Sequence, residues 1–437
     1  MPADVAEESR SRKEAVTCIL HSWSVQTTQL VVAVVSAVLA VHLFLTAAAQ
    51  ILLARRRGSY ALCHREILRA RPPAREEPCV GLVSVLKPLA GCDDDLDGNL
   101  ASFAEQDGVR HEIVFGVAST SDPALAAARR FLQAYPHVDA RIVVTDPDAA
   151  INPKVAQLVG LARHARGEVL VISDSNVRVA GDYLQKLVAP LDDPRCGLVT
   201  SVFAGTGERT LGAALENLQL SAVIAPFVVL STLGLPVTIG KSMAMRARDL
   251  EQVGGFESFG DVLAEDLMIG RRFAESGFRI ATSFAVVENR NVSGSLARMF
   301  DRHSRWAKMR RLIVPGFFTI EPLFSPIVTA LLGAILVPSR ATIGMLAVAM
   351  TLQTVASWLA AWSFRGRPLP LRYVPLELVR TFVMLGCWAS AWVSRTVVWR
   401  GHPLELGPNT TVVRPPSMPM ITALRRTRGS WRSAPTR

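Results

Sequence analysis

The chain is poor in cysteine, and the cysteines that it has follow no motif. All six are scattered, and no two of them have the Cys-x-x-Cys spacing (Cys18, Cys63, Cys79, Cys92, Cys196 and Cys387). This pattern argues against a disulfide framework and against a zinc site. It predicts reduced thiols in a cytosolic environment.

Charge is scarce as well. Charged residues make up only 19% of the chain, whereas hydrophobic residues make up 50%. This composition is too apolar for a purely soluble protein and not apolar enough for a protein that lies wholly inside a membrane. We therefore expect a mixed architecture.

Acidic residues are outnumbered by basic ones, 37 to 48, and the formal net charge is +11. The basic residues cluster behind the first apolar stretch (Arg55, Arg56 and Arg57), from Arg302 to Arg311, and in the C-terminal tail. Clusters beside apolar segments are typical of cytoplasmic flanks that face anionic lipid. No compact basic domain with interleaved aromatic side chains stands apart from these segments, so nucleic acid is not an expected partner.

The first long apolar run predicts a membrane anchor. Residues 1–28 are polar and mixed in charge, and we expect them to be disordered. Leu30 to Leu53 carries no formal charge and is longer than the roughly 20 residues that a membrane helix needs. It is also longer than the apolar core of a signal peptide, so we predict an uncleaved anchor over residues 29–54. The arginines behind it place the following domain in the cytoplasm.

Three further apolar segments lie within residues 316–400, ahead of a basic tail at 401–437. They are Phe317–Val337, Ala341–Phe364 and Tyr373–Val398. The last contains Arg380, which is costly facing lipid and is expected to point into protein or water. Three crossings would return the C-terminus to the outside, whereas the basic tail argues for the inside. A segment that is re-entrant or lies along the membrane surface would resolve this conflict.

Residues 78–315 have the pattern of an α/β domain. Short β-rich runs alternate with helix-like segments such as Pro123–Tyr135 and Pro153–Arg166. The runs are Leu82–Leu86, Glu112–Val117, Arg141–Val144 and Glu168–Ile172. This alternation predicts a mainly parallel sheet covered on both faces, with ligands bound beyond the carboxyl ends of the strands. The apolar but proline-interrupted segment Gln219–Ile239 is expected to be buried, or to lie at the membrane surface, under the site.

Polar residues stand at the ends of these expected strands. Asp174 and Asn176 follow the run that ends near Ser173, and their oxygens suit a hard divalent cation that bridges phosphates. Aspartate and asparagine also simply form turns. Lys87, after the first strand, could meet a nucleotide or lie on a solvated loop. Lys154, at a helix start, could favour an anion, although the proline before it is also an ordinary first-turn residue.

An acid and a basic-aromatic cluster precede the C-terminal apolar region. Asp266 lies among apolar neighbours, which raise the proton affinity of an acid as a general base requires. The alternative is a carboxylate that stabilises a helix N-terminus. Arg302, Arg305 and Trp306 share one face of a helix expected near residues 295–312. That face could clamp a diphosphate leaving group, and it equally suits an interfacial helix that binds lipid headgroups.

The triplet Gly240-Lys241-Ser242 is similar to the end of a phosphate-binding P-loop but does not complete that motif. Gly240-Lys241-Ser242 lacks the upstream glycine of a phosphate-binding P-loop, so the triplet by itself does not indicate a nucleotide site.

Taken in order, the motifs resemble those of ceramide glucosyltransferases and their bacterial relatives, including hopanoid-associated glycosyltransferases. They cover roughly residues 80–315 and are Val83–Leu89, Asn152-Pro153-Lys154, Asp174-Ser175, Ala264-Glu265-Asp266 and Arg302-x-x-Arg305-Trp306. The resemblance implies a GT-A fold, a UDP-sugar donor, Mg²⁺ or Mn²⁺, and a lipid acceptor reached from the cytosolic leaflet. It also implies that Asp174 supports the metal-diphosphate and that Asp266 takes the proton from the lipid hydroxyl. The Arg-Trp element would lie at the donor diphosphate and the acceptor entrance.

The chain departs from the family pattern at two places. Ser119 stands where the family tends to have an aspartate after the second strand, unless the register shifts to Asp122. The histidine of animal ceramide glucosyltransferases has no match around Ser221–Pro226. This second departure leaves open a hopanoid or another lipid as acceptor, with UDP-N-acetylglucosamine as donor.

The expected activity is inverting transfer of a hexose, glucose in the first place, from a UDP-sugar to the hydroxyl of a lipid such as ceramide. Two rival hypotheses remain. One is a processive polysaccharide synthase, which usually has more membrane spans than this chain offers. The other is a membrane scaffold that has lost catalysis, which Ser119 favours.

Overall fold

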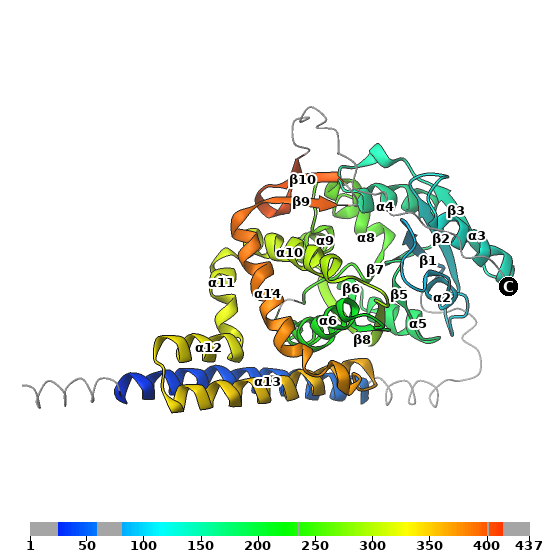
Figure 1. The fold of residues 1–437 in the computed structure, drawn as a ribbon. Coiled ribbons are helices and arrows are strands. Elements are labelled where there is room, and N and C mark those ends of the chain that lie inside the picture. Colours follow the sequence, from blue (N-terminus) through cyan, green and yellow to red (C-terminus); the bar gives the residue numbers. More distant parts are fainter. Residues whose placement is uncertain (1–24, 59–80, 235, 400–401, 414–437) are drawn as a thin grey trace, which may run out of the picture.

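In a computed structural model of the protein, residues 25–58, 81–234, 236–399 and 402–413 are described. An α/β domain lies beside helices contributed by both ends of the chain (Figure 1). The predicted disordered segment falls largely outside the described residues, but residues 25–28 already belong to the helix Val25–Gly58. This helix extends four residues beyond the predicted anchor at each end. The prediction followed hydropathy, and the added turns are mostly polar, so hydropathy does not mark them.

The domain contains most of the strands and helices. Its strands are β1 (Val83–Pro88), β2 (His111–Val117), β3 (Ala140–Val144), β4 (Val169–Ser173), β5 (Val177–Arg178), β6 (Cys196–Thr206), β7 (Ser242–Arg246) and β8 (Arg279–Arg290). Its helices are α2 (Leu96–Ala101), α3 (Ala124–Ala134), α4 (Pro153–His164), α5 (Tyr183–Val188), α6 (Leu211–Gln219), α7 (Ala225–Ser231), α8 (Ala247–Gln252), α9 (Glu265–Glu275) and α10 (Leu296–Ile313). After the domain come α11 (Pro315–Ile320), α12 (Pro326–Leu336), α13 (Arg340–Arg365), α14 (Leu376–Val393), β9 (Thr396–Trp399), β10 (His402–Leu406) and β11 (Val412–Val413).

The strands form one eight-stranded sheet in the order β3-β2-β1-β4-β7-β6-β8-β5. The pairings show that all of them run in one direction except β7 and β5. Every residue of β1 and β4 is buried, as expected for central strands of a sheet that is covered on both faces. The predicted α/β class with a mainly parallel sheet is confirmed.

The reversed strand β7 changes which residues meet at the edge of the sheet. It pairs with β4 in antiparallel register, with Ser173 opposite Ser242. The amino end of β7 therefore lies beside the carboxyl end of β4. Residues that precede β7, Gly240 and Lys241, arrive at the edge where ligands of such sheets bind.

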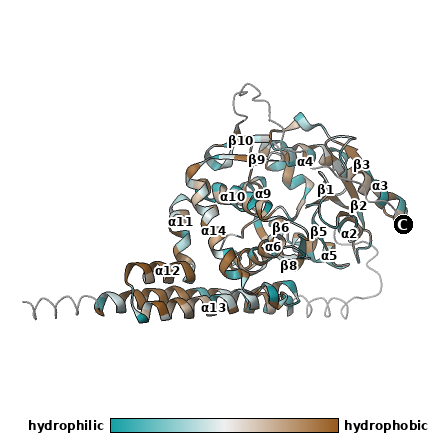
Figure 2. Cartoon of the chain, viewed as in Figure 1, coloured by the Kyte–Doolittle hydropathy of each residue, from teal (hydrophilic) through white to brown (hydrophobic). Residues whose placement is uncertain are grey.

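The helix Val25–Gly58 and α13 lie side by side along the base of the molecule (Figure 1). Val35 and Ala349 are buried in one apolar cluster, and Ser363 donates a hydrogen bond to Gln50 at 2.8 Å. Figure 2 shows hydrophobic residues along these helices and α12. Among the described residues, four helices are long and apolar enough to cross a membrane: Val25–Gly58, Leu211–Ser231, Arg340–Arg365 and Leu376–Val393.

The segment predicted as Phe317–Val337 is not one straight span. The helices Pro315–Phe324 and Pro326–Leu336 form a pair bent by 74°. At about 1.5 Å per residue, α12 alone is too short for a hydrocarbon core of about 30 Å. Pro326, the first residue of the second helix, has no N–H with which to continue the hydrogen bonding of the first helix. The bend fits the alternative of a re-entrant or surface segment.

The apolar segment around Gln219 is buried inside the protein. The helix Leu211–Ser231 comprises α6, a π-helical turn at Leu220–Ile224 and α7, and 78% of its most apolar window is buried. Arg380 of α14 reaches it, donating to Gln219 while pairing with Glu377 at 2.5 Å. This arginine points into protein, as predicted.

The structure adds detail at the C-terminal end. The third apolar segment is helical only to Val393, and the described part of the predicted tail, residues 402–413, forms a small antiparallel sheet with β9. This sheet docks on the domain, since Leu263 donates to the Thr410 carbonyl at 3.0 Å. Residues 402–413 therefore return to the α/β domain. Composition alone does not indicate this docking, because Ala264 and Thr410 lie 146 positions apart in the sequence.

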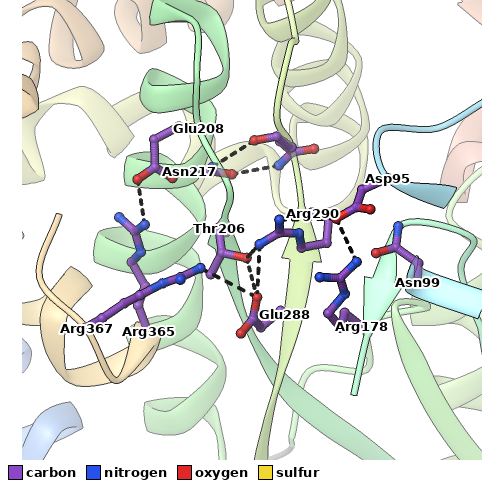
Figure 3. Close-up of polar contacts among 12 residues, drawn as sticks. Asp95, Asn99, Arg178, Thr206, Glu208, Asn217, Glu288, Arg290, Arg365 and Arg367 are labelled. Carbon is purple, nitrogen blue, oxygen red and sulfur yellow. Dashed lines mark hydrogen bonds and ion pairs between the residues drawn. The ribbon is translucent and has the colours of Figure 1, made fainter. Parts of the chain in front are cut away.

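A polar network connects the end of α13 to the domain (Figure 3). Arg365 donates to Glu208 at 2.6 Å, and Asn217 donates to the same carboxylate at 2.8 Å. Both side chains of the ion pair are almost fully buried, with 2% and 5% exposed. Arg367, two residues further on, is half exposed and lies 3.8 Å from Glu288.

We expect Arg365→Met to lower the stability of the protein by about 3–5 kcal/mol, because it leaves the Glu208 carboxylate buried without a cation. The matched control Arg367→Met removes an exposed pair and should cost less than about 1 kcal/mol. Thermal unfolding followed by tryptophan fluorescence in one detergent compares the two. Equal melting temperatures would show that the α13 contact does not hold the domain in place.

Candidate functional site

Charged side chains from three strand ends converge at one edge of the sheet. Lys87 closes β1, Asp174 follows β4, and Lys241 precedes the reversed strand β7. The ammonium of Lys87 donates to the backbone carbonyl of Asp174 at 2.8 Å. The predicted residues Lys87 and Asp174 therefore do lie together, and Lys241 joins them.

Lys154 is the centre of this cluster. Its ammonium lies 2.9 Å from the Asp174 carboxylate, 3.0 Å from that of Glu265 and 3.3 Å from the Gly240 carbonyl. Asn152 caps α4, since its side-chain oxygen accepts the N–H groups of Lys154 and Val155. The N-terminus of α4 is therefore capped by the chain itself, and only the lysine side chain serves the site.

Burial and charge act together on these groups. Burial lowers the pKa of Lys87 to about 7, although the Asp174 carboxylate opposes the change. Burial alone would raise the pKa of Asp174, but Lys154 and Lys241 outweigh it and hold that pKa well below the usual range. Burial also raises the pKa of Glu265, against the attraction of Lys154. Asp174 is thus a permanent anion inside a cationic cluster.

Asp174 and Asn176, the two predicted metal ligands, lie side by side, but an ammonium lies between them. Lys241 Nζ is 2.9 Å from Asp174 Oδ2 and 3.0 Å from Asn176 Oδ1. The other oxygen of Asp174 pairs with Lys154. No group of three or more histidine, cysteine, aspartate or glutamate side chains within the described ranges could hold a metal ion. In this arrangement the donor set does not fit a divalent cation.

Asp266 stands at the start of α9, next to the cluster. One of its carboxylate oxygens accepts the N–H of Gly240 at 2.7 Å, and the other accepts that of Leu267 at 2.8 Å. It is half buried, whereas its neighbour Glu265 is buried. A Cβ atom at Gly240 would lie 2.7 Å from the Lys154 ammonium, so a larger residue there would require Lys154 to move.

The C-terminal sheet holds the start of α9. Thr410 Oγ1 accepts the N–H of Ala264, the residue before the helix, at 3.2 Å, and Val412 donates to the Asp261 carbonyl at 2.7 Å. Thr410 has a φ of 61°, which is a strained conformation for a β-branched residue. These hydrogen bonds fasten the residues just before α9, the helix whose first turn contains Asp266.

Arg302, Arg305 and Trp306 lie on α10, as predicted, but each has a different neighbour. Arg302 forms an ion pair with the buried Glu216 of α6. The guanidinium of Arg305 lies 4.3 Å from the ring centre of Trp399. Trp306 packs against the main apolar core. The face is therefore not one uniform anion clamp.

Arg305 is the arginine left for a ligand. It forms no ion pair with any residue in the described part of the chain, and its buried Nε has no hydrogen-bond partner there. Burial lowers its pKa to about 10, so it stays charged at neutral pH. A half-buried cation without a carboxylate partner favours an anion.

Three consecutive aspartates near the site, Asp93, Asp94 and Asp95, were not among the residues that the sequence analysis predicted. Asp93 accepts a hydrogen bond from Ser175 and lies 3.2 Å from Arg298, and Asp95 pairs with Arg178 at 2.6 Å. Asp94 accepts the N–H groups that follow β8. The signal was a run of three carboxylates shortly after the first strand.

Ser119 and Asp122, where the sequence departs from the family pattern, form local contacts in the loop after β2. Ser119 is exposed, and its hydroxyl contacts Ser121. Asp122 accepts the N–H groups of Gly91 and Ala124, each at 2.9 Å, and so ties the loop after β1 to the start of α3.

Comparison with known proteins places the chain in a family. The sequence model of Glycosyl transferase family 21 matches residues 17–412. "Ceramide glucosyltransferase 1" of Caenorhabditis elegans is 26% identical over 354 residues, which is 78% of this chain and 75% of the relative. "Ceramide glucosyltransferase" of Komagataella phaffii is 36% identical over 119 residues, which is 26% of this chain and 23% of the relative.

Among solved structures, a mannosyltransferase from Pyrobaculum calidifontis in complex with GDP-Man and Mn²⁺ is 22% identical and has a TM-score of 0.45. The match covers 80% of this chain and 98% of that one. The family model spans most of the sequence and includes every predicted site residue. The protein therefore belongs to glycosyl transferase family 21, the ceramide glucosyltransferase family that its motifs resemble.

Proposed function

We propose that the protein transfers a hexose, glucose in the first place, from a UDP-sugar to the hydroxyl of a membrane lipid such as ceramide, with inversion. The observation that carries this proposal is the placement of Asp266. Backbone N–H groups orient its carboxylate beside a cluster of ammonium groups, and candidate membrane helices pack against the same domain. The relatives that share the family are named ceramide glucosyltransferases, which supports a lipid acceptor.

In the proposed reaction, Asp266 acts on the acceptor and the cationic side chains act on the donor diphosphate. Asp266 accepts the proton of the lipid hydroxyl while that oxygen attacks the anomeric carbon of the sugar. The bond from the anomeric carbon to the diphosphate oxygen breaks, and its electron pair leaves with UDP. Lys154, Lys241 and Arg305 stabilise the negative charge that grows on the diphosphate, because preorganised cations in a partly buried site need little rearrangement.

The same chemistry serves other substrates. A hopanoid or another lipid, with UDP-N-acetylglucosamine as donor, remains the alternative pair. A processive synthase would produce a polymer, whereas the proposed enzyme adds one sugar per lipid, so product length by mass spectrometry separates them. A scaffold without catalysis would neither transfer sugar nor hydrolyse any UDP-sugar.

In the proposed topology, residues 78–315 form the catalytic domain on the cytoplasmic side, and α10 lies at the membrane interface. The cationic residues of this region support that placement, since cytoplasmic flanks are rich in arginine and lysine.

Asp266→Asn should lower the transfer rate by about 10²–10⁴-fold, the contribution typical of a general base. The amide keeps the shape of the side chain but cannot take a proton. Transfer is measured with purified protein in detergent, over a panel of UDP-sugars and of ceramide, diacylglycerol and hopanoid acceptors. The control is Asp261→Asn, an exposed aspartate near the same helix. An active Asp266→Asn enzyme would rule out this residue as the base.

Arg302 and Arg305 should give opposite results when each is changed to methionine. Arg305→Met should weaken UDP binding by about 10–100-fold, the cost of losing a hydrogen bond to a charged group, with little change in melting temperature. Arg302→Met should lower the melting temperature, because it leaves Glu216 buried without its cation. Calorimetric UDP titration and thermal unfolding of both variants test this division. The reverse pattern would contradict it.

A further inference from the structure

Three lysines surround Asp174, and they are not equivalent. Lys87 is completely buried, and its ammonium lies 4.0 Å from the ring centre of Phe103. Lys154 is shared between the carboxylates of Asp174 and Glu265. Lys241 is more exposed than either, with 14% of its side chain accessible. Of the three it is the most accessible to a ligand.

The ammonium of Lys241 lies where a cation bound by Asp174 and Asn176 would lie. It contacts one oxygen of each residue, at 2.9 and 3.0 Å. These distances are those of charge-assisted hydrogen bonds. An ammonium has three N–H donors, and contacts with described residues occupy two of them. The third remains for an oxygen of an anionic ligand.

The fold enforces this position. The antiparallel pairing of β4 and β7 places Ser242 opposite Ser173, so the preceding Lys241 is a direct neighbour of Asp174. The backbone repeats the contact, since Asp174 N–H donates to the Lys241 carbonyl at 3.4 Å. A divalent cation on Asp174 and Asn176 would have to displace Lys241 and would be repelled by both it and Lys154.

We propose that Lys241 is the resident cation of the donor site and that the protein binds the diphosphate of its donor without a divalent metal. The inference rests on the proposed function, in that the anion is taken to be a nucleoside diphosphate. Asp174 then acts as a positioning residue, holding two ammonium groups at the edge of the sheet. The diphosphate oxygens bind to Lys241, with Lys154 and Arg305 as further cations.

The test measures UDP binding by calorimetry, with the purified full-length chain in detergent, in EDTA and in excess Mg²⁺ or Mn²⁺. We expect the affinity of the unmodified protein to agree within about twofold between these buffers. Lys241→Gln should bind UDP about tenfold more weakly in EDTA, the cost of one charge-assisted hydrogen bond. Mn²⁺ should restore part of that loss, because Asp174 and Asn176 become free to bind a metal.

A second readout does not depend on nucleotide. Electron paramagnetic resonance of added Mn²⁺ should show tighter metal binding by Lys241→Gln than by the unmodified protein. Lys241→Arg preserves the charge and should retain metal-independent UDP binding, which guards against a folding artefact. Lys186→Gln, in an exposed pair with Asp182, is the matched control and should change neither measurement.

The outcomes separate the two proposals. UDP binding that is lost in EDTA and restored by Mn²⁺ in the unmodified protein would overturn the assignment of Lys241 and leave the glycosyltransferase function standing. Unchanged affinity and Mn²⁺ binding in Lys241→Gln would overturn it as well. A protein that bound neither UDP nor GDP in any buffer would overturn the proposed donor together with this inference.

Discussion

One buried ammonium group joins the parts of the site that the chain supplies from far apart. Lys154 enters from the first turn of α4 and contacts the end of β4, the loop before β7 and the start of α9. Buried ion pairs add less net stability than their Coulomb attraction suggests, because both charges lose water. Lys154 therefore acts in part through position: it holds the start of α9, where Asp266 lies, beside the cationic edge of the sheet.

The chain after the candidate membrane helices also contacts this site. After α14 the chain returns to the domain as a small sheet, and Thr410 bonds to the residues that precede α9. The same sheet supplies Trp399, beside which Arg305 lies. The helices that could lie in a membrane and the carboxylate proposed as base are therefore connected through covalent chain and hydrogen bonds. This connection is what an enzyme with a lipid acceptor needs.

Electrostatics divides the cluster into fixed and available charge. Asp174 neutralises part of the positive charge of Lys154 and of Lys241. Glu265 neutralises a further part of the charge of Lys154. Arg302 is committed to Glu216, whereas Arg305 has no carboxylate partner among the described residues. The charge that remains for a ligand is thus borne by Lys241 and Arg305, which gain a partner when an anion binds.

The sequence by itself determined the α/β class and the helix start at Asn152-Pro153, and it singled out Asp174, Lys154 and Asp266 one by one, because apolar periodicity, capping residues and strand-end polar residues are local signals. Only the tertiary structure decided that β7 runs against its neighbours, which brings Lys241 to Asp174. It likewise decided that the small C-terminal sheet docks on the residues that precede α9. The physical reason is that strand order and direction depend on packing between segments distant in sequence, which local composition does not encode.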